Sequence, residues 1–320
     1  MGIHWFDEGP TEVASVGGKG SSLLEMMNAG LPVPPGFCID VEGYRSFEDA
    51  AGLAPLVSQL AEAPALTSPS GAAEAVLPLQ DRLGSTMLPA ALRSEIEDAY
   101  DDLCDRVTTS CLVASRSSAV CEDGATTSFA GIYETYLHLE GAEPVSSSVL
   151  DCYRALWDPR AVQYRAARGI DQTAEQMAVV VMSMIPADVA GVAFSANPIS
   201  RERREVLINA SWGLGEAVVS GQVMPDNVVA SKQDGGVIAY EVGDKSIEIV
   251  LNEAAGSGTI QRSVDPARAA EACLSEDDVA AVTELARRAE EHYGLPQDIE
   301  FARVGADWFL LQSRPITGLS

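Results

Sequence analysis

The sequence predicts an α+β protein built from two domains or from one large two-lobed unit. Three observations favour this class. Residues 46–105 are rich in alanine, leucine and acids at helical spacing, short β-branched runs separated by glycine begin at residue 112, and a capped amphipathic helix occupies 275–296. With 320 residues and 47% hydrophobic content, the chain can bury a sizeable core.

The first predicted element is a short helix over residues 20–30, GSSLLEMMNAG. Ser21 or Ser22 is a suitable N-cap, and Gly30 is a suitable stop. The glycine-rich stretch VGGKG at 16–20 therefore opens a helix. The stretch that follows, LPVPPGFCI, is expected to be extended because proline disfavours the α region in the residue before it.

The loop TSPSG at 67–71 divides the helical region, and strands follow it. The runs LVAS, ETYLHL, MAVVVMSMI, GVAFSA, EVLINAS, NVVAS, GVIAYEV and IEIVL predict mixed sheets. In the helix after them, Ser275 is the expected N-cap and Gly294 the expected stop. The apolar stripe of this helix consists of Val279, Val282, Leu285, Ala286, Ala289 and Tyr293.

Composition excludes some partners. The net charge of −26 with only 21 Lys and Arg residues disfavours nonspecific binding to nucleic acid or to an anionic membrane. The 6 cysteines form no C-x-x-C pair, which favours a reducing compartment over a disulfide framework. Since neither a signal peptide nor an apolar stretch of about 18 residues is present, we expect a cytoplasmic protein.

The stretch VGGKG does not fit the phosphate-binding P-loop. That motif needs Ser or Thr after the lysine and a glycine five residues before Gly18, where this sequence has Gly20 and Val13. Two interpretations remain. Lys19 either lies in a solvated surface turn or, together with backbone N–H groups at a helix start, forms an anion site.

A second segment, VASRSSAVCEDGATTSFAGIYETYL at 113–137, combines a strand that carries Arg116 with a stretch of small hydroxyl residues. Small residues ahead of Phe129 allow the backbone to approach phosphates closely. A long hairpin loop with a buried arginine is the alternative.

The C-terminal segments DIEFARV (298–304) and WFLLQSR (308–314) flank GAD, a turn that can close an antiparallel hairpin. Pairing centred on Ala306 sets Glu300 opposite Gln312 and Asp298 opposite Arg314. Alternation then puts these four on one face, and Ile299, Phe301, Leu311 and Phe309 on the other. Two carboxylates suit Mg²⁺ and an arginine suits phosphate oxygens. A solvent-facing hairpin with cross-strand salt bridges is the alternative.

Together these segments resemble the N-terminal nucleotide-binding domain of the phosphoenolpyruvate synthase and pyruvate phosphate dikinase family, which includes rifampin phosphotransferase. The resemblance covers nearly the whole chain and depends on the order and spacing of its motifs. The motifs are VGGKGSSLLEMMNAGLPVPPGF, SRSSAVCEDGATTSFAGIYETYL, VAGVAFSANPIS, NASWGLGEAVVSGQVMPD and DIEFA with WFLLQSRPIT.

The resemblance implies an ATP-grasp fold in which two α+β lobes, here 1–185 and 186–320, clamp ATP. Phosphates would be contacted by Lys19 and Arg116 and covered by residues 126–131, while the strand at 182–185 would line the adenine. The implied ATP-binding residues are Lys19, Arg116, Thr127, Ser128, Gly131, Thr135, Met182, Ser183, Met184, Ile185, Gln312 and Arg314. The implied Mg²⁺ ligands are Glu300, Gln312 and Asp298, and the implied catalytic residues are Arg314, Lys19 and Arg116.

The family transfers the β-phosphoryl group of ATP to a histidine on a swivelling domain and releases AMP and phosphate. This sequence departs from the pattern in two places. It stops at SRPITGLS without a swivelling histidine domain or a substrate domain, and Met182 stands where family members often have glutamine. The methionine puts strict preference for ATP in doubt.

Three hypotheses follow. The first is a stand-alone subunit that phosphorylates a histidine on a separate carrier protein and works with a substrate-binding subunit, an arrangement that phenylphosphate synthase resembles. The second is an excised ATP-binding domain of a longer antibiotic phosphotransferase or phosphoenolpyruvate synthase. The third is a nucleotide-sensing module without catalysis.

Overall fold

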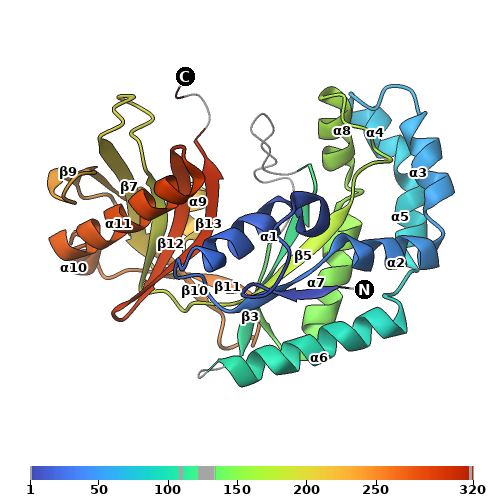
Figure 1. Ribbon diagram of the computed structural model, residues 1–320, viewed down its shortest axis with the longest axis horizontal. Helices are drawn as coiled ribbons and strands as arrows, with labels where there is room; N and C mark the ends of the chain where they lie inside the picture. The colour runs from blue at the N-terminus through green and yellow to red at the C-terminus, as the bar shows by residue number, and fades with distance from the viewer. Residues whose placement is uncertain (1, 108–110, 122–132, 134, 317–318, 320) are drawn as a thin grey trace. The chain divides into compact units, whose positions relative to one another are not determined.

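The structure of the protein is a computed structural model that describes residues 2–107, 111–121, 133, 135–316 and 319. The chain divides into two compact units (Figure 1). The first contains Met1–Leu24 and Pro35–Ser183, and the second contains Glu25–Pro34 and Met184–Ser320. The stretch Glu25–Pro34 thus belongs to the second unit although the first surrounds it in sequence.

The first unit is a five-stranded sheet with helices. Its strand order is β1 (Ile3–Trp5), β2 (Gly36–Ile39), β5 (Met177–Ser183), β3 (Leu112–Ala119) and β4 (Thr135–Glu140). The helices that lie wholly within this unit are α2 (Val41–Ala51), α3 (Ala54–Ala61), α4 (Pro69–Ala75), α5 (Leu77–Gly84), α6 (Ala90–Arg106), α7 (Ala142–Ala155) and α8 (Pro159–Ala167). In Figure 1, α4 lies beside α8, which agrees with their many contacts.

One face of this sheet forms the core of the first unit. Phe37, Val113 and Val181 are fully buried there, in one cluster with Tyr44 of α2 and Trp157 of the turn between α7 and α8. The Trp157 Nε1–H group donates to the Tyr44 hydroxyl at 2.9 Å, so the one polar atom of the indole is satisfied inside the core. The opposite face of the sheet does not take part in this core.

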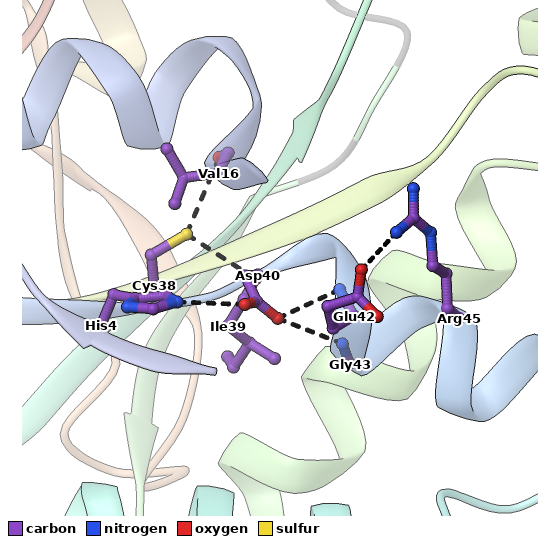
Figure 2. Close-up of polar contacts among 8 residues, drawn as sticks. All are labelled: His4, Val16, Cys38, Ile39, Asp40, Glu42, Gly43 and Arg45. Carbon is purple, nitrogen blue, oxygen red and sulfur yellow. Dashed lines mark hydrogen bonds and ion pairs between the residues drawn. The ribbon is translucent and has the colours of Figure 1, made fainter. Parts of the chain in front are cut away.

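The junction between β1, β2 and α2 is held by one carboxylate (Figure 2). Asp40 Oδ1 accepts hydrogen bonds from the backbone of Glu42 at 3.0 Å and Gly43 at 3.3 Å, which caps α2. Asp40 Oδ2 lies 3.0 Å from His4 Nε2. Together the three contacts fix the edge strand β1 to the start of α2.

The second unit contains a six-stranded sheet and a two-stranded ribbon. The large sheet has the order β13 (Asp307–Pro315), β12 (Gln297–Val304), β6 (Val189–Phe194), β7 (Glu205–Trp212), β8 (Asp226–Ser231) and β9 (Val237–Glu241). The ribbon pairs β10 (Ile247–Leu251) with β11 (Thr259–Ser263), and the helices are α9 (Glu216–Val219), α10 (Pro266–Ala269) and α11 (Glu276–Tyr293). Helix α11 packs against β12, β6, β7 and β8.

Asp226 is the buried polar centre of the second unit. Its carboxylate receives the Lys245 ammonium group, the Tyr240 hydroxyl at 2.8 Å and the backbone N–H of Cys273 at 2.7 Å. The side chains of Asp226 and Lys245 are both fully buried. This set of bonds links β8, β9 and the segment before α11.

The predicted helix at the C-terminal side is confirmed. Helix α11 has Ser275 as N-cap, in a reciprocal capping box with Asp278, and ends at Gly294 in the left-handed conformation. The strands predicted from β-branched runs are also confirmed, but the expectation of mixed sheets is wrong. Every pairing between named strands is antiparallel within the described residues.

Three local expectations are corrected. The first helix, α1, runs over Val13–Asn28 rather than 20–30, and Ser21 is no N-cap because its hydroxyl donates to the Thr11 carbonyl at 2.6 Å. The expected loop at 67–71 already contains the start of α4, which Ser68 caps. The cysteines are not all reduced, because Cys104 and Cys111 form a disulfide between the end of α6 and the start of β3.

The remaining described cysteines, Cys38, Cys121, Cys152 and Cys273, are free thiols. Among the described residues, we find no helix with the length and apolar character that crossing a bilayer requires.

Candidate functional site

The glycine-rich segment is a break inside α1. Gly17 has φ 69° and ψ 177°, a non-helical conformation that divides the helix into two parts. A Cβ atom at Gly17 would lie 2.0 Å from the carbonyl oxygen of Ser118 on β3. Both the backbone conformation and the close approach therefore require glycine at this position.

Ser118 holds the two sides of this break together. Its hydroxyl donates to the Val16 carbonyl at 2.8 Å and accepts from the Gly20 N–H at 3.0 Å. The Cys38 thiol on β2 donates to the same Val16 carbonyl at 3.7 Å (Figure 2). Burial raises the pKa of Cys38 far above its usual range, so this thiol is neutral and structural. Hydrogen bonds from β2 and β3 thus hold the segment around Gly17 in place.

Lys19 follows the break and is half-buried. Its Nζ donates to the Ser117 carbonyl at 3.1 Å, next to Arg116 in sequence. Arg116 pairs with Thr135 of β4, and its neighbour on the same face, Ala114, pairs with Met182 of β5. Since paired residues share a face, Arg116, Thr135 and Met182 lie on the face of the sheet opposite the apolar core. The first unit therefore gathers four of the predicted residues.

Three predicted nucleotide contacts, Thr127, Ser128 and Gly131, lie outside the described residues. The chain on either side of them is anchored by buried charged groups. Before them, the Cys121 N–H donates to Glu175 Oε1 at 3.3 Å, and after them the Tyr133 hydroxyl accepts from Arg165 at 3.0 Å. Ser183 ends β5 and is buried, whereas Met184 and Ile185 follow it half-exposed and outside any strand.

In the second unit, the predicted pairing of the hairpin is confirmed where the polar residues lie. Asp298 is opposite Arg314, and Glu300 is opposite Gln312. The register then shifts by one residue between Glu300 and Phe301, so that Phe301 pairs with Leu310 and Val304 with Asp307. The turn is consequently shorter than the predicted GAD and consists of residues 305–306.

This irregularity corrects the expected opposite face. Leu310, rather than Leu311, lies opposite Phe301 and is fully buried, and Phe309 lies opposite Ala302 instead. The reason is a β-bulge at Leu311, which adds one residue to β13 and reverses the alternation beyond it. The polar face itself is unaffected.

The Asp298 and Arg314 side chains form an ion pair. Arg314 Nε and Nη2 both lie 2.9 Å from Asp298 Oδ2. Burial raises the pKa of Asp298, Arg314 opposes this rise, and the nearby charge of Glu300 adds to it. Asp298 is therefore a carboxylate with a cation on one side and a second carboxylate on the other.

The donor set fits Mg²⁺ bound together with phosphates rather than a site made by protein alone. Within the described residues, no cluster of three or more His, Cys, Asp or Glu side chains is able to hold a metal ion. The hairpin offers Glu300, the amide of Gln312 and the buried Asp298 as oxygen donors. Mg²⁺ commonly uses one or two carboxylates and completes its shell with water and phosphate oxygens.

Sequence reasoning missed Ser118 and Cys38, which carry the glycine break. A signal for Ser118 was present, because it follows Arg116 by two residues and so shares its face of a strand. Cys38 gave no such signal, since a buried cysteine in an apolar stretch is usually a core residue.

Taken together, the chain is an antiparallel α+β protein with a glycine-lysine break in one unit and a carboxylate-amide-arginine hairpin in the other, which are residue types suited to phosphate and Mg²⁺. Comparison with known families agrees. Residues 13–320 match the pyruvate phosphate dikinase, AMP/ATP-binding domain family, and the chain belongs to it.

Curated relatives include a probable phosphoenolpyruvate synthase of Methanothermobacter thermautotrophicus, 38% identical over 99% of this chain and 46% of that protein. A phosphoenolpyruvate synthase of Pyrococcus furiosus is 36% identical over 99% of this chain and 44% of its own length. A rifampicin phosphotransferase of a Streptomyces species is 36% identical over 96% of this chain and 35% of its own length. The chain thus spans less than half the length of these relatives.

Proposed function

We propose that this chain is the nucleotide-binding part of an ATP-dependent phosphotransferase of the dikinase type, with an ATP-grasp fold. In this proposal it binds Mg²⁺-ATP and transfers the β-phosphoryl group to a histidine outside the segment, on a carrier domain or a carrier protein. Membership of the AMP/ATP-binding family supports nucleotide binding. The proposal further assigns the chain to the cytoplasm, where ATP is available.

The observation that carries the proposal is the polar face of the hairpin. Two adjacent pairs, Asp298 with Arg314 and Glu300 with Gln312, stand on one face of β12 and β13. A structural hairpin needs no buried carboxylate beside a second carboxylate, because like charges in a partly desolvated place are costly. A divalent cation and a phosphate chain relieve that cost.

Glu300, Gln312 and Asp298 would hold Mg²⁺ in this scheme. When bound there, the ion would neutralise charge on the phosphates during transfer. Arg314 pairs with Asp298 through its Nε and Nη2 atoms, and a guanidinium group is suited to phosphate oxygens. Arg314 would then stabilise the charge of the phosphoryl group in flight.

The residues of the first unit would bind the other parts of ATP. Lys19 and Arg116 are neighbours through Ser117, and both would contact phosphates. Thr135, opposite Arg116, and the segment from Met182 to Ile185 would contact the nucleoside. Thr127, Ser128 and Gly131 keep the role that the family resemblance gives them, next to the phosphates.

In the proposed transfer, a nitrogen of the acceptor histidine forms a bond to the β-phosphorus. The bond from the β-phosphorus to the oxygen bridging it to the α-phosphate breaks, and AMP leaves. Water cleaves the terminal phosphate, which leaves as inorganic phosphate. The phosphohistidine then donates its phosphoryl group to a small-molecule acceptor at another site.

The test is a transfer assay with ATP labelled at the β-phosphorus and the histidine carrier domain of a phosphoenolpyruvate synthase as acceptor. We expect acid-labile label on the carrier, and a loss of about 100-fold or more in rate for Arg314→Gln, because such groups stabilise transition-state charge. Glu271→Gln, an exposed carboxylate outside the hairpin, is the matched control for Glu300→Gln. Equal rates for these two carboxylate variants would contradict the proposal.

Binding without transfer is the outcome that favours the alternative, a nucleotide-sensing module. Isothermal titration with Mg²⁺-ATP separates the two. If the wild-type chain binds ATP but no carrier histidine is ever labelled, the catalytic part of the proposal fails and the binding part stands.

A further inference from the structure

A row of polar residues crosses the large sheet at the level of Glu300. Starting at the hairpin edge, Gln312 is opposite Glu300, Glu300 opposite Val192, and Val192 opposite Asn209. Asn209 is in turn opposite Asn227. Residues opposite one another in antiparallel strands share a face, so both asparagines lie on the face that carries the hairpin residues.

We propose that Asn209 and Asn227 extend the hairpin site into a phosphate-binding row, in which their amide NH₂ groups donate to phosphate oxygens of the nucleotide. This inference rests on the proposed binding of Mg²⁺-ATP and adds to it two residues on β7 and β8. Neither residue lies in the hairpin or in the glycine segment.

The geometry of the row suits a phosphate chain. Adjacent strands are about 4.8 Å apart, so the backbones of Glu300 and Asn209, with β6 between them, are separated by about 10 Å. Between them stands Val192, an apolar side chain that is half-exposed. The row thus sets a carboxylate and an amide on either side of a short apolar residue, a spacing comparable to the length of a triphosphate chain with its metal ion.

The hydrogen bonding of the two amides supports a ligand role. Other asparagines of the second unit have structural work: Asn197 donates to Glu205 at 2.8 Å, and Asn252 accepts from the Ala255 N–H at 3.2 Å. Within the part of the chain that the structure describes, the side chains of Asn209 and Asn227 make no hydrogen bond to protein. Both asparagines are half-exposed, so a ligand is able to reach their side chains.

The charge of the row also favours phosphate over a further cation. Amides donate hydrogen bonds without adding charge, and here they stand beside a carboxylate in a protein of net charge −26. A row built for a second metal ion would use carboxylates, which are the preferred ligands of Mg²⁺. The neutral donors therefore complement the anionic side of the nucleotide.

The decisive variants are Asn209→Asp and Asn209→Ser. We expect Asn209→Asp to weaken Mg²⁺-ATP binding by about tenfold or more, because a donor is lost and a negative charge faces phosphates. Asn209→Ser should weaken it less, and Asn227→Asp should also weaken it. Asn252→Asp, the same change in the same unit but off the row, is the control and should bind as the wild type does.

Isothermal titration with AMP, ADP and ATP, each with Mg²⁺, reads out the role. The loss in Asn209→Asp should grow with the number of phosphates and be absent for AMP. Equal loss for all three nucleotides, unchanged affinity in both Asn209 variants, or tighter binding by Asn209→Asp would overturn the inference. Circular dichroism checks that each variant is folded. If Asn209→Asp is not folded, the affinity of Asn209→Ser decides the question.

Failure of the wild-type chain to bind ATP would instead refute the proposed function. That result is distinguishable, because it needs no variant.

Discussion

Substitution of Gly17 by alanine tests whether the break in α1 is required for both stability and the position of Lys19. The conformation at Gly17, φ 69° with ψ 177°, is nearly restricted to glycine and costs another residue about 1–3 kcal/mol. The new Cβ would also lie 2.0 Å from the Ser118 carbonyl oxygen and 2.4 Å from its hydroxyl. Backbone atoms have no rotamer by which to move away, so the segment must separate from β3.

That separation breaks the two hydrogen bonds of the Ser118 hydroxyl, to Val16 and from Gly20. Each contributes about 0.5–1.5 kcal/mol, so together with the backbone term we expect a loss of about 2–6 kcal/mol in the free energy of unfolding. Mg²⁺-ATP affinity should fall as well, since Lys19 moves with the segment.

The control is Gly30→Ala. Gly30 has a φ of +69° too, but a Cβ added there would meet no atom within 4 Å, so only conformational strain of about 1–2 kcal/mol is expected. Urea unfolding followed by circular dichroism measures both variants, and hydrogen exchange of the β3 backbone reports the local opening. If Gly17→Ala matches Gly30→Ala in stability and binds Mg²⁺-ATP normally, the reasoning is refuted.

Three further perturbations test other parts of the structure. Lys245→Met leaves Asp226 buried without its cation and should lower the free energy of unfolding, measured with urea, by about 3–5 kcal/mol. Burial raises the pKa of Asp226, but the hydrogen bonds from Cys273, Lys245 and Gly243 outweigh burial and hold that pKa low. The stabilisation is therefore present above the pKa of the unfolded state and is lost as pH falls through the pKa of the folded state. The pKa of Asp298 is raised, so a proton competes with Mg²⁺ for this carboxylate. Mg²⁺-dependent ATP binding should therefore weaken as pH falls through the pKa of Asp298. Asp298→Asn should remove this part of the pH dependence. Replacing Cys104 and Cys111 together by serine opens a short loop and should lower the free energy of unfolding by about 2–3 kcal/mol relative to the oxidised wild type, with the reduced wild type as the control.

Each of these has an outcome that counts against it. Unchanged stability of Lys245→Met would show that the Asp226 site tolerates an uncompensated charge. An acid limb of ATP binding that persists in Asp298→Asn would assign that limb to another group. Equal stability of the serine variant and the oxidised wild type would show that the disulfide has no stabilising effect.

The sequence predicted best what depends on alternation and on local chemistry. The pairs Asp298–Arg314 and Glu300–Gln312 were predicted from a turn centred on Ala306, and they hold because the extra residue at Leu311 compensates for a turn one residue shorter than predicted. Helix α11 was found because Ser275, the acidic first turn and Gly294 act within a few residues of the helix ends. The helix signals are local, and no distant contact overrides them.

What the sequence concealed depends on contacts between distant residues. The break at Gly17 exists because β3, about 100 residues later, approaches the helix at Ser118. The row from Gln312 to Asn227 joins five strands, and its order cannot be read from a chain in which β6, β7 and β8 precede β12. The disulfide escaped detection because Cys104 and Cys111 lack a recognised spacing motif.

The bulge at Leu311 separates the pairing of the hairpin at its turn from the pairing at its base, which are usually linked. In a regular ladder, changing the turn by one residue would move every side chain of β13 to the opposite face. Here the extra residue in β13 absorbs a one-residue difference between the tip, where Val304 meets Asp307, and the base, where Glu300 meets Gln312. The bulge, and not the turn at residues 305–306, therefore determines which residues of β13 stand opposite Asp298 and Glu300.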